Sequence, residues 1–100
     1  LLKPGVIGFD GGMAREHTRT YFLGKLAREL EFRGLDATLR ADPPSLRVGD
    51  PGARLLTETV DCVPVAEGWY YRWSWGEVVE STTNPAEAAD RIARILGPIR

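Results

Sequence analysis

The chain has 100 residues, of which 43% are hydrophobic, and its 13 basic and 14 acidic residues leave a net charge of −1. This length and composition are typical of one soluble globular domain. General polyanion binding usually needs a clear positive excess, so the near-neutral charge disfavours a nucleic-acid partner.

Cysteine usage and hydropathy suggest the compartment. Cys62 is the only cysteine, so no disulfide can form within the chain. No secretory leader is visible, and no apolar run approaches the roughly 20 residues that a membrane-spanning helix requires. We therefore expect a cytoplasmic protein that does not enter a membrane.

The first 18 residues have no clear periodicity. Lys3–Gly5 and Gly11–Gly12 carry residues typical of turns and linkers. The stretch Gly8–Gly12 is glycine-rich but lacks the lysine and Ser/Thr of a phosphate-binding P-loop. We expect residues 1–18 to be a flexible segment, followed by a single domain over residues 19–100.

The spacing of apolar residues predicts a first helix over residues 20–33. Its apolar stripe has three- and four-residue spacing and consists of Phe22, Leu23, Leu26, Ala27 and Leu30. Gly34 stands where a left-handed residue would end the helix, and Leu35 can fold back onto the last turn.

Alternating residues then predict four strands, over residues 36–41, 46–48, 55–63 and 69–79. Prolines and glycines separate these runs, as in the turn at residues 42–45. On the third strand the predicted inner face carries Leu56, Val60 and Cys62. Short connections between successive strands favour an antiparallel meander.

The fourth predicted strand holds all three tryptophans. Its period-two pattern places four large rings on one face, namely Trp69, Tyr71, Trp73 and Trp75. Tyr70, Arg72 and Ser74 fall on the opposite face. The pattern is that of a half-buried strand whose aromatic face packs against other elements.

The last helix is predicted from Pro85 to Leu96. Asn84 suits the N-cap, and Glu87 has the spacing of a capping box. Its apolar stripe consists of Ala88, Ile92, Ile95 and Leu96. Two outer ion pairs are expected at four-residue spacing, Glu87 with Arg91 and Asp90 with Arg94.

These elements predict an α+β fold in the order α-β-β-β-β-α. We expect a four-stranded, mainly antiparallel sheet with both helices packed on one face. The predicted structural core consists of Phe22, Leu26, Leu30, Trp69, Tyr71, Trp73, Trp75 and Ile92.

No pattern of residues points to catalysis, to a metal or to a cofactor. His17 is the only histidine, so a zinc site would need an unusual set of ligands. Cys62 is interpreted as a small buried hydrophobe, because no basic partner near it in sequence would activate its thiol. We therefore predict a protein that is not an enzyme.

The open face of the sheet is the candidate binding surface. Strand parity places Arg40, Arg47, Tyr70 and Arg72 there, and arginine and tyrosine are enriched at binding hot spots. One interpretation is a solvated face whose arginines pair with Asp61 and Glu58; the others are a protein partner and stacked nucleic-acid bases. A small-ligand pocket between the helices and the tryptophan-rich strand is a further alternative.

Several stretches resemble a family of small uncharacterised actinobacterial proteins. They are Arg33–Leu39, Pro44–Val48, Asp50–Ala53, Trp73–Glu77 and the helix Ala88–Leu96. Members of that family are often encoded beside helix-turn-helix regulators. The resemblance implies an accessory or regulatory role through an unknown protein partner, and it implies no catalytic residue. A homodimer formed through the open face or an edge strand is also compatible with this role.

Overall fold

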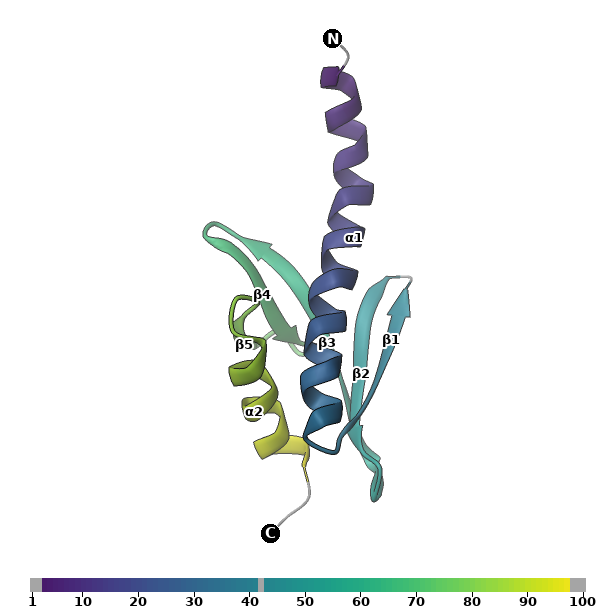
Figure 1. The fold of residues 1–100 in the computed structure, drawn as a ribbon, viewed down its shortest axis with the longest axis vertical. Coiled ribbons are helices and arrows are strands. Elements are labelled where there is room, and N and C mark those ends of the chain that lie inside the picture. The colour runs from purple at the N-terminus through teal and green to yellow at the C-terminus, as the bar shows by residue number, and fades with distance from the viewer. Residues whose placement is uncertain (1–2, 42, 98–100) are drawn as a thin grey trace.

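The computed structural model describes the backbone of residues 3–41 and 43–97, and the side chains of residues 17–41, 43–52 and 57–97. The described residues form two helices and five strands, which are labelled in Figure 1. They are α1 (Lys3–Phe32), β1 (Asp36–Ala41), β2 (Pro44–Asp50), β3 (Ala53–Val65), β4 (Gly68–Trp73), β5 (Val78–Ser81) and α2 (Pro85–Leu96). The strands form one antiparallel sheet in the order β1-β2-β3-β4-β5. The α+β class is confirmed, but the sheet has five strands instead of the predicted four.

The extra strand arises because the predicted tryptophan-rich strand is interrupted by a turn. β4 ends at Trp73, whose N–H donates to the carbonyl of Glu77 at 2.8 Å. Gly76 closes the turn with a φ of 105°, a left-handed conformation that glycine adopts without steric cost. The regular spacing of large rings continues through this turn, so periodicity alone does not reveal it. Trp75 therefore lies in the turn and is 53% exposed, which corrects its predicted place in the core.

The helix α1 is longer than predicted, because it begins at Lys3 instead of near residue 20. Figure 1 shows its N-terminal part extending beyond the sheet. The flexibility expected for residues 1–18 stays a prediction. At the other end, the Leu35 N–H donates to the Leu30 carbonyl at 3.0 Å, and Gly34 has a φ of 87°. These features form the predicted glycine stop, with Leu35 buried against the last turn.

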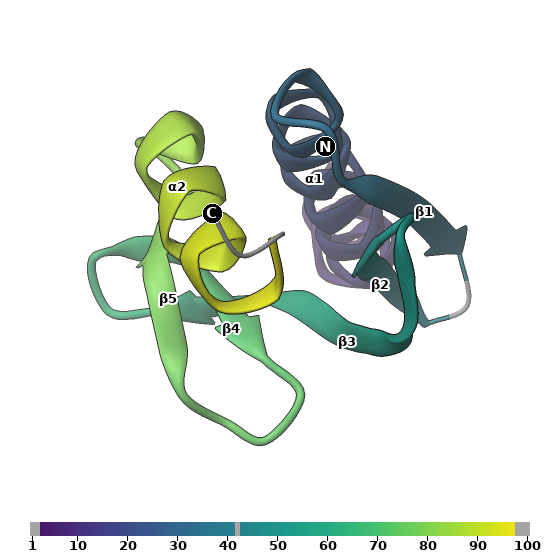
Figure 2. The same ribbon diagram turned by 90° about the horizontal axis from the view of Figure 1, so that it is seen from below.

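The core lies between the sheet and the two helices, which Figure 2 shows on the same side of the strands. Sheet and helices contribute fully or nearly fully buried side chains, among them Leu23, Leu26, Leu30, Leu46, Val48, Val60, Cys62, Tyr71, Trp73, Ala88 and Ile92. Phe22 and Trp69 are partly buried and pack against this cluster. The hydroxyl of Tyr71 donates to the Phe22 carbonyl at 2.8 Å, so the polar end of this buried ring is satisfied. Of the predicted inner face of β3, the side chain of Leu56 lies outside the described residues.

The helix α2 follows the prediction in its bounds but not in all its polar contacts. Asn84 occupies the N-cap without a side-chain cap bond, and its Nδ2 donates to Glu80 at 3.2 Å. The ion pair expected between Asp90 and Arg94 is also replaced. Asp90 accepts from Arg33 Nε at 2.8 Å, and this contact joins α2 to the end of α1. Among the described residues, no helix is long and apolar enough to cross a membrane.

Candidate protein-binding face

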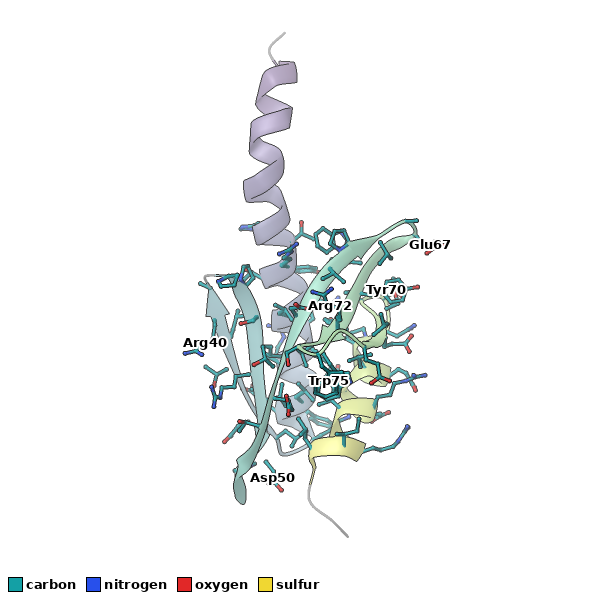
Figure 3. All side chains as sticks on the ribbon, turned by 180° about the vertical axis from the view of Figure 1, so that it is seen from behind. Arg40, Asp50, Glu67, Tyr70, Arg72 and Trp75 are labelled. Carbon is teal, nitrogen blue, oxygen red and sulfur yellow. The ribbon has the colours of Figure 1, made fainter. Side chains whose placement is uncertain are left out.

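The face of the sheet opposite the helices carries the four residues predicted for binding. Figure 3 views the molecule from this side, with Arg40, Tyr70 and Arg72 among its labels. In the strand register, Arg40 is opposite Ser45, Arg47 lies between Thr38 and Thr59, and Arg72 is opposite Asp61. The four residues share one face but come from three strands, and they do not form one contact cluster. We call this surface the open face.

Arg72 is neutralised on the open face by its cross-strand neighbour. Its Nε and Nη2 donate to the two carboxylate oxygens of Asp61 at 3.2 and 3.0 Å. These hydrogen bonds raise the pKa of the Arg72 guanidinium. A two-point arginine–carboxylate pair is geometrically specific, so Arg72 orders the centre of the face more than it offers a free charge. This confirms the predicted pairing of an arginine with Asp61, whereas no described residue forms an ion pair with Glu58.

Arg40 and Arg47 differ from Arg72 in their charge environment. Both side chains are exposed, and neither forms an ion pair with any described residue. Arg47 makes only a long contact from Nη2 to the Thr57 hydroxyl, at 3.4 Å. A guanidinium has five N–H donors and keeps its charge at all physiological pH values. The open face therefore presents two unneutralised cations with most of their donors directed to solvent.

Arg47 also lines a hollow of about 340 Å³ near the end of the β2–β3 hairpin. The other polar groups around it are Asp36, Thr38, Asp50 and Thr57. Asp50 is partly used, because its Oδ1 accepts the Gly52 N–H at 3.0 Å. The hollow thus combines one cation, two carboxylates and two hydroxyls. Its acidic rim was not predicted, because the β2–β3 register, with a bulge at Gly49/Asp50, could not be foreseen from the sequence.

A second hollow, of about 280 Å³, lies between β5 and α2 and was not predicted in this form. Its apolar lining includes Trp73, Val78 and Ile95, and its polar lining includes Arg91 and Arg94. Trp75 stacks on Trp73 with ring centroids 4.7 Å apart and planes 9° from parallel. The hollow touches the tryptophan-rich segment and α2, as the alternative small-ligand pocket requires. Its volume falls just below the range of about 300–1,000 Å³ usual for ligand sites.

The buried titratable groups belong to the core. Burial raises the pKa of the Cys62 thiol to about 12, while Arg19 opposes this rise and Asp61 adds to it. Burial, followed by the nearby Cys62, also raises the pKa of Tyr71. At neutral pH both groups are therefore protonated. His17 is exposed, and the described residues contain no cluster of three His, Cys, Asp or Glu side chains suited to a metal ion.

Comparisons with protein-family models, curated proteins and solved structures found no match for this chain. A function is therefore inferred from the geometry of the open face.

Proposed function

We propose that this protein is a non-enzymatic accessory or regulatory protein that binds a partner protein through the open face. The observation that carries the proposal is the exposure of Arg40 and Arg47, neither of which forms an ion pair with a described residue, on the sheet face opposite α1 and α2. Arginine and tyrosine supply much of the binding energy at protein interfaces, and the half-buried Tyr70 lies on the same face. The resemblance to proteins encoded beside transcription regulators agrees with such a role.

The chemistry of the face indicates an acidic segment of a folded or extended partner. A carboxylate of the partner can accept two parallel hydrogen bonds from the free guanidinium of Arg47. The hydroxyls of Thr38 and Thr57, which line the same hollow, can donate to the remaining oxygen positions. A single acidic side chain entering the hollow would thus find several donors.

The small number of free cations on the open face favours a protein over a nucleic acid. Asp36 and Asp50 line the hollow together with Arg47, and their carboxylates oppose any further negative charge there, whether a phosphate or a carboxylate, so the hollow accommodates few anionic groups. Nucleic-acid modules neutralise several phosphates at once. On the open face Arg72 is already neutralised by Asp61, which leaves few cations for that purpose. A protein partner can instead place its own N–H or ammonium donors opposite the aspartates.

Affinity purification with this protein as bait tests the proposal when variants are compared. We expect a partner that survives nuclease treatment and that is lost from Arg47→Glu and weakened by Tyr70→Ala. A charge reversal at a hot spot should weaken binding by about 30-fold or more. Arg72→Glu is less informative, because it also breaks the pair with Asp61.

Arg28→Glu is the matched control, because Arg28 is an exposed arginine of α1 on the helical side of the molecule. The proposal requires that this variant retain the partner. A partner lost equally from Arg28→Glu and Arg47→Glu would show only a dependence on net charge. Retention by both variants would place the binding site away from the open face, and capture that disappears with nuclease would identify a nucleic acid instead.

A further inference from the structure

The strand β1 is a free edge of the sheet. It is the first strand in the order β1-β2-β3-β4-β5 and pairs only with β2 among the described strands. An edge strand presents unpaired backbone N–H and C=O groups, and proteins commonly block such edges with lysine, proline or a bulge. The sequence of β1, Asp-Ala-Thr-Leu-Arg-Ala, contains neither lysine nor proline. Its pairing with β2 is also regular along all six residues.

Most side chains of β1 are exposed to solvent in a single copy of the chain. All of them are exposed except the half-buried Ala37. Leu39 is 40% exposed although its cross-strand neighbour Leu46 is fully buried. Leu39 therefore lies at the border of the core and lacks a neighbour on its outer side. A further strand added to this edge would cover it.

The residues of β1 are self-complementary about Thr38. When an antiparallel strand pairs with a copy of itself around Thr38, Asp36 is opposite Arg40 of the second copy, and Ala37 is opposite its Leu39. Directly opposed residues must lie on the same face of a sheet. Asp36, Thr38 and Arg40 alternate onto the open face, whereas Ala37 and Leu39 alternate onto the helical face, so every pair satisfies this condition.

The charges select this register over its nearest alternative. Centring the pair on Leu39 would oppose Thr38 to Arg40 and leave Asp36 beyond the paired strand segment. Centring it on Thr38 creates two Asp36–Arg40 pairs across the two-fold axis. Opposite charges in directly opposed positions are stabilising, and like charges there are destabilising. Arg40, which forms no ion pair with the described residues of its own chain, thereby gains one.

We propose that two copies of the chain associate through β1, antiparallel and centred on Thr38, to form one continuous sheet. The two-fold axis is perpendicular to the sheet, so all four helices lie on one side and both open faces lie on the other. The contact is closed, because each copy uses its β1 edge once. This interface does not depend on the proposed partner protein. It engages Arg40, so Arg47 and Tyr70 are the residues of the open face that stay available to that partner on each copy.

Charge reversal provides the test. Sedimentation equilibrium of the purified full chain should show a dimer for the wild type. Each single variant, Asp36→Arg or Arg40→Asp, turns both intersubunit ion pairs into pairs of like charge. Each should therefore raise the dimer dissociation constant by about tenfold or more. The double variant Asp36→Arg/Arg40→Asp restores both ion pairs with reversed polarity and should recover the wild-type association. Circular dichroism spectra of all variants check that the monomer fold is retained.

Arg94→Asp is the control, because it reverses the charge of an exposed arginine on α2, which packs near β5 at the opposite edge of the sheet from β1, and this variant should remain dimeric. A wild-type chain that stays monomeric at its highest soluble concentration would overturn the proposal. So would a dimer that is insensitive to both single reversals, or one that the double variant fails to restore. The partner-binding proposal fails through a different result, namely that Arg47→Glu retains the partner protein in affinity purification.

Discussion

At the scale of single residues, Cys62 shows how the core determines chemical behaviour. Its side chain is fully buried, and its position on the inner face of β3 agrees with its interpretation from sequence as a small hydrophobe. Burial raises the pKa of its thiol from about 9 to about 12. The fold therefore accommodates the protonated thiol and disfavours the thiolate.

This shift predicts a loss of stability in alkali. Below about pH 9 the thiol is protonated in both states, so it contributes no pH dependence. Between about pH 9 and 12 the unfolded chain releases the proton while the folded chain retains it, so the free energy of unfolding falls as pH rises. Urea unfolding at pH 8, 9 and 10 should show this fall in the wild type and a weaker one in Cys62→Ala. Parallel profiles for the two proteins would mean that the thiol is not the responsible group.

At the scale of elements, Arg33 links the two helices. Its Nε donates to Asp90 of α2 and its Nη1 to the Glu29 carboxylate, both at 2.8 Å. Its Nη2 also reaches the Ala86 carbonyl at 3.3 Å. The hydrogen bonds to Asp90 and then Glu29 raise the pKa of the Arg33 guanidinium. The arginine side chain is only 22% exposed, so this network is less screened by solvent than a fully exposed surface pair.

We therefore predict that Arg33→Ala lowers the free energy of unfolding by about 1–2 kcal/mol. Arg91→Ala is the comparison. Arg91 is 50% exposed and forms its pairs with Glu80 and Glu87 at 3.4 and 3.3 Å, so its loss should cost less than about 1 kcal/mol. Denaturant unfolding of both variants measures the difference. An equal cost, or a larger one for Arg91→Ala, would contradict the role given to Arg33.

The elements also show what the sequence could predict. The glycine stop at Gly34 and the bounds of β1 and α2 follow from local patterns, because caps, turns and periodicity act within a few residues. The pairing of Arg33 with Asp90 could not be predicted, since it depends on how two distant helices pack. Trp75 was misplaced because a turn can preserve the spacing of large side chains while changing their direction. Gly76 was the available signal for that turn.

At the scale of the whole molecule, the layered architecture separates two kinds of surface. The helices cover one face of the sheet and bury the aromatic residues Tyr71 and Trp73. The opposite face stays open, and strand parity predicted from the sequence which residues it carries. The hollow around Arg47 could not be predicted in the same way, because its aspartates come from different strands whose register only the folded sheet defines.

Site-specific photo-crosslinking in cells tests the central claim most directly. A photoreactive residue at Thr59, which is opposite Arg47 on the open face, is compared with one at Arg28 on the outside of α1. We expect a nuclease-resistant adduct with another protein from position 59, absent from position 28 and reduced by Arg47→Glu. Protein adducts from position 28 alone, or only nucleic-acid adducts from position 59, would contradict a protein-binding open face.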